Sequence, residues 1–394
     1  MKYDAIQSKT EFLPRGTIRK TRWYLLEALT LTLTLTFLLT FRVATESLAT
    51  PSQTLPQTPS QAPMFLAQSS PISPKRPTSP QSPSGARISA NSPTVHRELR
   101  LEMHWTPQSQ FAGYIMAIEK HFYRDAGLPP IKLIWNNQDR SFESLADGSD
   151  FCTGWLADGL AARNRGLAIV ELAQYFDKPS QLFVVRADSD IRTPQDIQGR
   201  RVGIFGGNHG VLLRRFLETQ KIQAEVIPQS TSLVPFLRGA IDVCSAMYYN
   251  EYNRLIEAGL RPEQLRTFAL ADYGLNFPED ALFTSEAMWR NEPELCRKLV
   301  LATQRGWEYA FDPEHEQETL ETVLRYASRV THSNPNHQRW MLRAIQVQFP
   351  QSRNDWGRLS PEVYQRLTKE LMAMGEITTI VPFEAFYVGD KILR

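Results

Sequence analysis

The chain has 394 residues, and its 44 basic and 42 acidic residues give a formal net charge of +2. This near-neutral balance gives no reason to expect nucleic acid or an acidic surface as a partner. The length allows one large domain or two ordinary ones, and a hydrophobic fraction of 42% is typical of a globular protein with an ample core.

The N-terminal segment has the pattern of an export signal. A basic flank precedes an apolar, threonine-rich run over 25–41, which only Glu27 interrupts with a charge. This order is typical of a signal peptide, whose positive side stays in the cytoplasm. Small residues predict cleavage after Ala49. We therefore predict that 1–49 is a cleaved signal peptide or, equally, an uncleaved membrane anchor, since 25–41 is just long enough to span a bilayer.

Residues 50–96 are rich in Pro, Ser, Gln and Thr. Such a composition buries too little apolar surface to order itself, and proline keeps the chain extended. We predict a disordered linker, which either spaces the folded part from a membrane or is a dispensable leader.

From about Leu99 onward, strand-like runs alternate with amphipathic helical stretches, which predicts an α/β fold with mostly parallel sheets and helices on both faces. In the helix predicted over 110–126, Phe111, Tyr114 and Ile118 recur at helical spacing. Strands are predicted near 99–103, 131–135, 151–155, 169–175 and 182–185, and further helices over 141–147 and 156–165. These elements predict a first lobe over 97–186.

The pattern restarts at Pro194, where Thr193 is a capping residue and proline takes the first helical position. Strands are predicted near 201–205, 224–227, 242–247 and 268–271, and helices near 234–238 and 251–258 and in the segment that ends at Gln220. They predict a second lobe over 187–280. Residues 281–394 are predicted to be mostly helical and to complete the first lobe. Two chain crossings between the lobes suggest a hinge that closes on a ligand.

Two patches of aromatic and polar residues lie where a predicted strand passes into a predicted helix, one in each lobe. They are Trp105-Thr106-Pro107-Gln108 and Met247-Tyr248-Tyr249-Asn250-Glu251-Tyr252. Because strand carboxyl ends face the crevice in open α/β sheets, these patches suit a cleft for a flat, polar small molecule. The predicted ligand-binding residues are Trp105, Gln108, Phe111, Tyr114, Trp155, Asp158, Gly207, Asn208, Tyr248, Tyr249, Asn250, Glu251 and Tyr273.

Each of these residues also has a structural interpretation. Trp105 could stack on a heteroaromatic ring or cap the sheet edge. Asn250 offers a donor and an acceptor, which suits an aminopyrimidine edge. Glu251 could accept from a ring amino group, or could only complement the helix N-terminus. Strand alternation lets only one of Tyr248 and Tyr249 face the cleft. The turn Gly206-Gly207-Asn208-His209-Gly210 could cradle a phosphate or carboxylate, or only turn tightly.

No catalytic or metal site is predicted. Cys152, Cys244 and Cys296 lack the C-x-x-C spacing of a zinc or iron–sulfur site and are interpreted as small buried residues. His104 and His121 are catalytic candidates by residue type only, because no nucleophile motif lies near either. We therefore predict no enzyme activity, no cofactor and no metal.

Several stretches resemble, in the same order, the thiamine-pyrimidine-precursor binding family of NMT1/THI5-like (SsuA/THI5-type) solute-binding proteins. The stretches are Trp105-Thr106-Pro107-Gln108-Ser109-Gln110-Phe111-Ala112-Gly113-Tyr114, and those over 119–128, 145–151, 194–203, 247–252 and 272–280. The resemblance runs from about Leu99 to the C-terminus. It implies a two-lobed periplasmic binding protein type II fold with a helical C-terminal segment.

The resemblance also implies a function. The protein is expected to be periplasmic or extracytoplasmic, either free or anchored by 25–41. It is expected to capture a small nitrogen heterocycle, such as a thiamine pyrimidine precursor or a flavin precursor, by lobe closure. It would then deliver this ligand to an ABC permease in the membrane, without a cofactor.

Fungal relatives instead make the thiamine pyrimidine from a histidine of their own chain and pyridoxal phosphate held on a lysine. This sequence has Asp158 where that histidine would align and Gly154 where the lysine would sit, and no cysteine run over 274–283. A pyridoxal-phosphate-dependent, synthase-like enzyme, with Lys178 as the candidate lysine, is therefore one alternative. A periplasmic ligand-sensing module is the other.

Overall fold

The computed structural model describes residues 97–136, 141–328 and 334–394. All of them belong to one compact unit, Pro93–Arg394. The predicted signal or anchor over 1–49 and the predicted linker over 50–96 lie outside the described residues. Of the helices that the structure describes, none is both long and apolar enough to cross a membrane.

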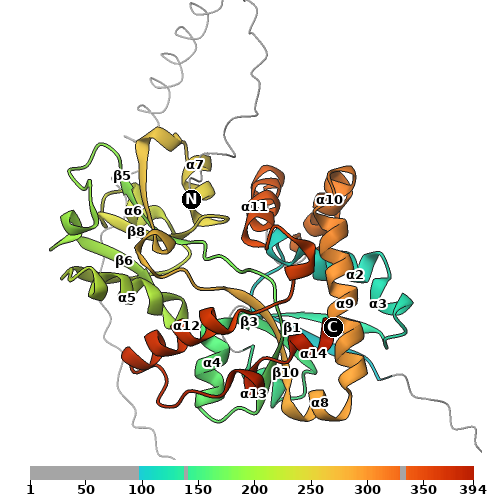
Figure 1. The fold of residues 1–394 in the computed structure, drawn as a ribbon. Coiled ribbons are helices and arrows are strands. Elements are labelled where there is room, and N and C mark those ends of the chain that lie inside the picture. Colours follow the sequence, from blue (N-terminus) through green and yellow to red (C-terminus); the bar gives the residue numbers. More distant parts are fainter. Residues whose placement is uncertain (1–96, 137–140, 329–333) are drawn as a thin grey trace, which may run out of the picture. The chain divides into compact units, whose positions relative to one another are not determined.

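The first of two five-stranded sheets has the strand order β2-β1-β3-β10-β4 (Figure 1). Its strands are β1 (Leu99–Met103), β2 (Ile131–Trp135), β3 (Phe151–Trp155), β4 (Ile169–Gln174) and β10 (Asp280–Ser285). β1 is parallel to β2 and β3, whereas β10 runs antiparallel between β3 and β4. The sheet is mixed, not mostly parallel as predicted, because the chain re-enters it through β10 after forming the second lobe.

The second sheet has the order β7-β6-β8-β5-β9. Its strands are β5 (Gln181–Arg186), β6 (Arg201–Phe205), β7 (Glu225–Gln229), β8 (Val243–Met247) and β9 (Leu265–Ala269). β5 is the strand that was predicted to end the first lobe, but it pairs with β8 and β9. The predicted lobe boundary at residue 186 is therefore wrong. An apolar run such as 182–185 fits either sheet, so its periodicity does not decide to which lobe the strand belongs.

Helices flank the sheets in both lobes. They are α2 (Ala112–Glu119), α3 (Phe122–Asp125), α4 (Leu156–Asn164), α5 (Val211–Thr219), α6 (Val234–Leu237) and α7 (Glu251–Glu257), with 3-10 helices η2 (Ser109–Phe111), η3 (Glu143–Leu145), η4 (Pro194–Ile197), η5 (Gly207–Gly210), η6 (Pro262–Gln264) and η7 (Leu270–Tyr273). The continuous helix predicted over 110–126 is corrected, since His121 takes a left-handed φ of 62° between α2 and α3. The helix predicted over 141–147 is reduced to η3.

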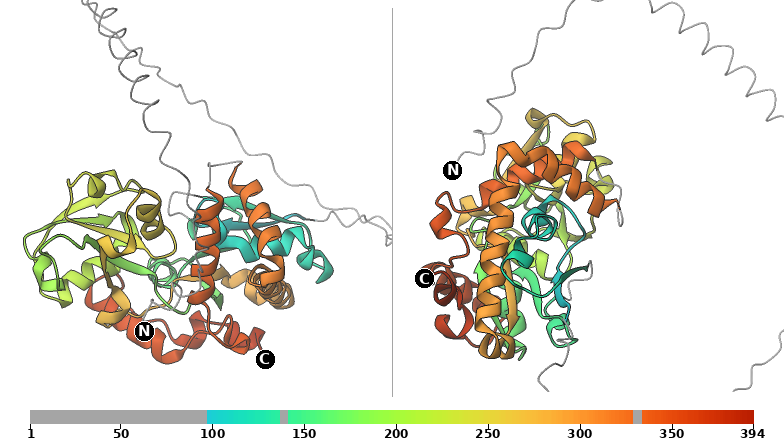
Figure 2. Two further views of the ribbon diagram at one scale, coloured as in Figure 1. Left: turned by 90° about the horizontal axis from the view of Figure 1, so that it is seen from above. Right: turned by 90° about the vertical axis from the view of Figure 1, so that its right-hand side faces the viewer.

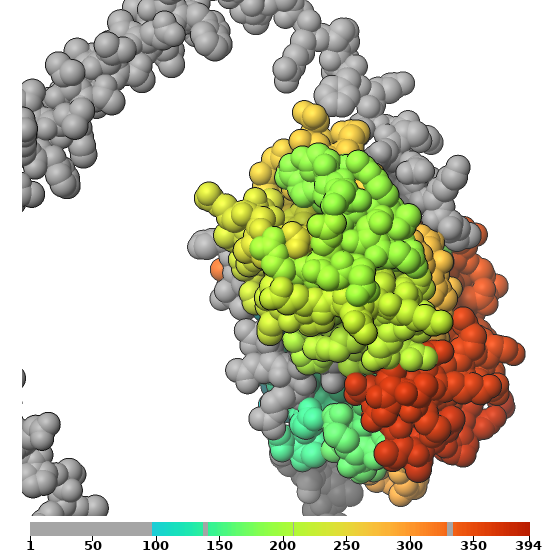
Figure 3. Space-filling view, turned by 90° about the vertical axis from the view of Figure 1, so that its left-hand side faces the viewer, coloured from blue at the N-terminus to red at the C-terminus, as the bar shows by residue number. Residues whose placement is uncertain are grey.

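The C-terminal part is helical, as predicted. It comprises α8 (Glu286–Asn291), α9 (Pro293–Ala310), η8 (Pro313–His315), α10 (Glu316–Ala327), α11 (Pro335–Gln348), η9 (Arg353–Asp355), α12 (Pro361–Ala373), α13 (Phe383–Phe386) and α14 (Gly389–Ile392). α9 packs along α2 of the first lobe (Figure 2). α12 packs on α4, and its Glu370 accepts a hydrogen bond of 2.7 Å from Arg215 of α5. The tail therefore touches both lobes, and Figure 3 shows its last helices (red) beside the second lobe (green).

The contact between α2 and α9 depends on small residues at the crossing and one large residue beside it. A Cβ on Gly306 would lie only 2.0 Å from the carbonyl oxygen of Gly113. Next to this close approach, the fully buried Trp307 ring lies 6.0 Å from the Tyr114 ring and 4.9 Å from the Phe349 ring. Trp307 is thus the centre of an aromatic core that fixes the first lobe.

Candidate ligand-binding site

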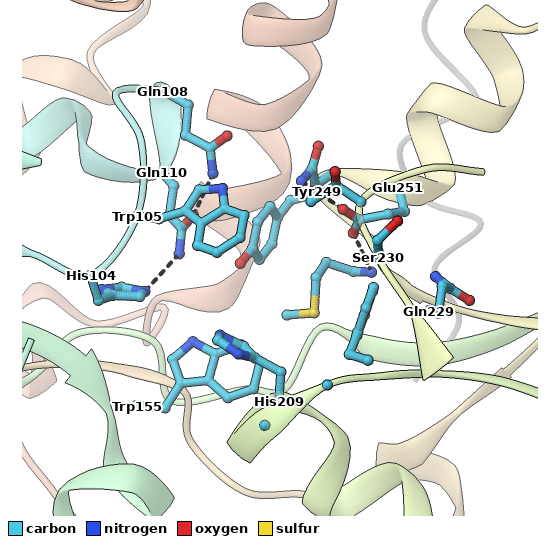
Figure 4. Close-up of a pocket in the computed structure, with 16 residues that line it drawn as sticks. His104, Trp105, Gln108, Gln110, Trp155, His209, Gln229, Ser230, Tyr249 and Glu251 are labelled. Atoms are coloured by element: carbon cyan, nitrogen blue, oxygen red, sulfur yellow. Dashed lines mark hydrogen bonds between the residues drawn. The ribbon is translucent and has the colours of Figure 1, made fainter. Parts of the chain in front are cut away.

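A cavity of about 400 Å³ is lined by residues of both lobes (Figure 4). The first lobe contributes His104, Trp105, Gln108, Gln110 and Trp155, and the second contributes Phe205, Gly206, Gly207, His209, Gln229, Ser230, Thr231, Met247, Tyr249, Asn250 and Glu251. The volume falls within the range typical of sites for small molecules and cofactors. Most lining residues follow the last residue of a strand, which is where crevices form in α/β sheets.

The first-lobe wall begins directly after β1. His104 donates its backbone N–H to Thr153 Oγ1 at 3.0 Å, and its ring Nδ1 lies 2.9 Å from the same oxygen. Trp155 is the last residue of the neighbouring strand β3. Because β1 and β3 are parallel, their carboxyl ends place His104, Trp105 and Trp155 at one edge of the sheet.

A buried network of polar side chains connects this wall to Asp280. Gln108 Nε2 donates to Gln110 Oε1 at 2.6 Å, and Gln110 Nε2 donates to Asp280 Oδ2 at 2.8 Å. His104 Nε2 lies 3.6 Å from Asp280 Oδ1. Burial raises the pKa of Asp280 well above its ordinary value of 3.8, and the hydrogen bond from Gln110 opposes that rise. Cavity side chains and a buried acid therefore form one connected unit.

Glu279 joins the two segments that cross between the lobes. Its carboxylate accepts from Ser180 N at 2.7 Å and from Ser180 Oγ at 2.6 Å. Ser180 lies on the outward crossing between β4 and β5, and Glu279 on the return crossing before β10. Burial raises the pKa of Glu279 to about 7, against the opposing effect of the Ser180 hydrogen bonds. These bonds hold the two crossing segments together.

The second-lobe wall centres on Glu251, the first residue of α7. Its Oε2 accepts from Met247 N at 3.0 Å, and its Oε1 accepts from Asn250 Nδ2 at 2.9 Å. Burial raises the pKa of Glu251 above its ordinary value of 4.5. Each carboxylate oxygen keeps a further lone pair, so Glu251 can still accept from a ligand. Tyr249 lines the cavity beside it.

The structure brings seven of the predicted ligand residues together around the cavity: Trp105, Gln108, Trp155, Gly207, Tyr249, Asn250 and Glu251. The side chain of Asn208 lies outside what the structure describes. Of the two adjacent tyrosines, Tyr249 lines the cavity. Tyr248 instead stacks on Tyr252 with 5.3 Å between ring centroids, as expected for neighbours that face opposite ways.

Four further predicted residues lie away from the cavity lining. Phe111 is fully buried against His104, and Tyr114 belongs to the aromatic core around Trp307. Their helical spacing marks the face that packs on the sheet rather than a ligand surface. Tyr273 packs edge-on against Phe216 at 5.0 Å, and Asp158 sits in the first turn of α4. These four assignments are therefore corrected.

Several lining residues were not predicted: His104, Gln110, Phe205, Gly206, His209, Gln229, Ser230, Thr231 and Met247. For some of these residues, their position at the end of a strand could have predicted that they line the cavity. His104 directly follows β1, and Gln229, Ser230 and Thr231 lie at the end of β7. The rule that carboxyl ends of strands line the crevice selects these positions. Gln229 itself bonds to the β8 backbone, since its Nε2 donates to Ser245 O at 2.7 Å.

Helix α11 links the tail to both lobes beside the cavity. On the first lobe, Gln338 Oε1 accepts from Ser109 N at 2.6 Å. On the second lobe, Trp340 Nε1 donates to the carbonyl oxygen of Tyr248 at 3.2 Å, and the two rings lie 5.3 Å apart. We call His337 and Trp340 the α11 latch, because both residues contact the second lobe from a helix held on the first.

His337 connects the α11 latch to a cavity residue. Its Nε2 lies 3.1 Å from Asn250 Oδ1, and its Nδ1 lies 2.9 Å from Asn253 Nδ2. These contacts fit a neutral imidazole that carries its proton on Nε2. Glu257 Oε2 lies 3.5 Å from Nδ1. Burial, and then the charge of Arg254, lower the pKa of His337 to about 4.

Acidification is expected to weaken the α11 latch. The pKa of His337 in the folded protein lies below its ordinary value of 6.5, so the stabilisation is complete above that pH and is lost as pH falls toward 4. Relative to a His337→Gln variant, the protein should lose on the order of 2 kcal/mol of unfolding free energy over this window. Urea unfolding of both proteins at each pH measures the difference, and a difference independent of pH would contradict this assignment.

Comparison with known proteins places this geometry in a family context. The family model described as NMT1/THI5 like matches residues 108–316, just over half of the chain. Riboflavin-binding protein RibY of Chloroflexus aurantiacus is 25% identical over 240 residues, which cover 58% of this chain and 67% of the relative.

Solved structures share the fold. The periplasmic aliphatic sulphonate binding protein SsuA from Escherichia coli superposes with a TM-score of 0.58 and 13% identity, over 75% of this chain and 98% of that chain. The desulfurization enzyme DSZB superposes with a TM-score of 0.54 and 15% identity, over 75% and 97% of the two chains. At such identities the likeness concerns the fold alone. It confirms the predicted two-lobed periplasmic binding protein fold with its helical C-terminal segment.

Proposed function

The chain belongs to the NMT1/THI5-like family, and from this premise we propose that it is an exported solute-binding protein of an ABC importer. It captures a small nitrogen heterocycle between its two lobes and presents it to a membrane permease. The cavity has walls from both lobes, and two segments of the chain cross between the lobes, which supports capture of a ligand between them. Lobe closure around the ligand would exclude water and hold it for delivery.

The composition of the cavity lining is the observation that carries the proposed ligand class. Trp105, Trp155 and Tyr249 offer aromatic faces, and Gln108 and Glu251 offer polar groups at the rim of those faces. Among the described residues that line the cavity there is no lysine or arginine. Aromatic faces favour a planar ring, and a buried carboxyl group favours a ligand that donates hydrogen bonds or carries positive charge.

The same lining argues against a sulfonate as ligand. A sulfonate group is a permanent anion with acceptor oxygens only, and in a buried site it needs cationic or N–H donors. Here it would face the Glu251 carboxyl group, and the ionisable nitrogen donors among the described lining residues are the imidazoles of His104 and His209. We therefore infer a neutral or cationic ring, of which an aminopyrimidine precursor of thiamine and a flavin are the two candidates suggested by the relatives.

A pyridoxal-phosphate enzyme is the weaker alternative on structural grounds. Lys178, the candidate lysine, donates to the carbonyl oxygen of Val347 at 3.2 Å and lines a different groove, next to Trp356. At position 154, a Cβ would lie 2.4 Å from the ring of Phe142, so a lysine there requires rearrangement. Asp158 stands where the reacting histidine of the synthase would align. A ligand-sensing module would use the same cavity, and a neighbouring permease gene would favour the importer.

A thermal-shift screen of the purified full chain tests the proposed ligand class. The panel contains aminopyrimidines, thiamine, riboflavin and alkanesulfonates at about 100 times the expected dissociation constant. At this excess a ligand specific to the folded state adds about 2.7 kcal/mol of stability. We expect a clear rise in Tm with a nitrogen heterocycle and none with sulfonates. A rise with sulfonates alone would contradict the proposal.

Incubation with pyridoxal phosphate separates the enzyme alternative. We expect the unmodified protein and the Lys178→Arg variant to show the same absorbance after incubation, with no Schiff base formed on Lys178. The reason is that this side chain lies away from the cavity. An absorbance that depends on Lys178 would favour the synthase-like enzyme instead.

A further inference from the structure

The glycine-rich turn after β6 holds a histidine inside the cavity. Gly207 has a φ of +60°, and a Cβ on Gly210 would lie 2.2 Å from the carbonyl oxygen of Phe205. Both glycines are therefore required by this backbone path. The turn is anchored from β5, because Gln181 Nε2 donates to the carbonyl oxygen of His209 at 2.6 Å. The sequence pattern thus serves to present His209, which lines the cavity.

The His209 ring lies against two aromatic walls of the opposite lobe. Its centroid is 4.4 Å from the Trp155 ring and 6.2 Å from the Trp105 ring, with interplanar angles of 74° and 65° (Figure 4). Both tryptophans belong to the first lobe, whereas His209 comes from the second. The imidazole therefore packs on Trp155 and reaches toward Trp105, so it occupies a place where an aromatic ligand could stack on these indoles.

The charged surroundings of His209 favour a cation at this place. A positive charge on the His209 ring would lower the pKa of Glu251, Glu279 and Asp280, opposing the rise that burial causes in each. The other titratable groups of the lining are His104, whose Nε2 lies 3.6 Å from Asp280 Oδ1, and Tyr249, whose pKa burial raises well above its ordinary value of 10.0. A flat ring with an N–H donor or a positive charge is thus the chemistry that this region accommodates.

We propose that His209 is a specificity-determining residue, whose imidazole takes the slot beside Trp105 and Trp155 that a ligand ring would otherwise use. A ligand enters this slot by displacing the imidazole, so that only planar rings replace its contacts with the two indoles. This inference rests on the proposed function for the identity of the ligand. The occupancy of the slot by His209 is independent of that identity, and can be tested without it.

Chemical rescue with free imidazole tests the occupancy. A His209→Ala variant of the full chain should bind imidazole saturably, at least about tenfold more tightly than the unmodified protein, with a change in tryptophan fluorescence from Trp105 and Trp155. His121→Asn is the matched control, because it removes an exposed histidine and asparagine tolerates the left-handed backbone there. It should behave as the unmodified protein. Equal imidazole binding by all three proteins would overturn the inference.

The heterocycle that passes the thermal-shift screen provides the second test. Displacement predicts that His209→Ala binds it about threefold to tenfold more tightly, since no internal ring has to leave. A loss of about tenfold would show that His209 stacks on the ligand, and would overturn displacement. His209→Asn, which keeps a polar group of smaller size, gives the same readouts if the alanine variant does not fold. If no heterocycle binds but imidazole rescue succeeds, the proposed function fails while the occupancy of the slot by His209 stands.

Discussion

Replacing Glu251 with glutamine is expected to weaken binding of a nitrogen heterocycle by about tenfold to a hundredfold, equivalent to one charge-assisted hydrogen bond of about 1.5–3 kcal/mol. The carboxylate is buried, and Met247 N and Asn250 Nδ2 fix its orientation. Glutamine has nearly the same shape, but it cannot offer a charged acceptor with both oxygens. Calorimetric titration of both proteins with the same ligand measures the difference.

The pH dependence of stability should also change in this variant. Burial raises the pKa of Glu251, so ionisation of this group costs stability as pH rises above the unfolded value of about 4.5. Glu251→Gln loses one of the two accepted hydrogen bonds, but its stability should fall less with rising pH than that of the unmodified protein. Glu263→Gln is the control, because this exposed carboxylate lies outside the cavity. If both variants bind ligand equally well, Glu251 has no role in recognition.

Replacing Trp307 with alanine is expected to lower the free energy of unfolding by about 3–5 kcal/mol, the range for truncation of a buried tryptophan. The Trp307 ring is fully buried, stacks on Phe311 at 5.1 Å, and contacts Tyr114 and Phe349. The adjacent Gly306–Gly113 approach prevents α9 from sliding to refill the space. Urea unfolding at pH 7 measures the loss.

A matched control separates core packing from the removal of any tryptophan. Trp289 on α8 is only partly buried, and Trp289→Ala should lose less than about 2 kcal/mol. Similar losses for Trp307 and Trp289 would contradict the central position assigned to Trp307. Neither residue lines the cavity, so both variants should keep the dissociation constant of the unmodified protein wherever they are folded.

Much of the fold could be predicted from periodicity, because the alternation of strands and helices is a local property of the chain. The sheet to which β5 belongs could not be predicted in this way. The residues of β5, such as Phe183 and Val184, are buried on both faces, and the same apolar run satisfies either sheet. Only its pairing with β8 and β9, which are distant in sequence, decides the matter. Similarly, the left-handed backbone at His121 has no strong sequence signal.

In the candidate site, too, some residues can be predicted from the sequence and others cannot. Trp105, Tyr249 and Glu251 can be placed at the cavity from the sequence, because aromatic and polar groups follow predicted strands there. Phe111 and Tyr114 were assigned to the site because they lie in the same stretch as Trp105, but their helical face packs into the core. His209 could not be predicted, since the glycines around it suggested an anion cradle and only the fold shows that they direct its ring toward the tryptophans.

The most direct test of the proposed function is calorimetric titration of the full chain at pH 7 with an aminopyrimidine, riboflavin and an alkanesulfonate, under identical conditions. The lining of aromatic faces, amides and buried carboxyl groups predicts one-to-one binding of a nitrogen heterocycle and no heat from the sulfonate. Saturable binding of the sulfonate with no binding of either ring would contradict the assignment of the cavity to a neutral or cationic heterocycle.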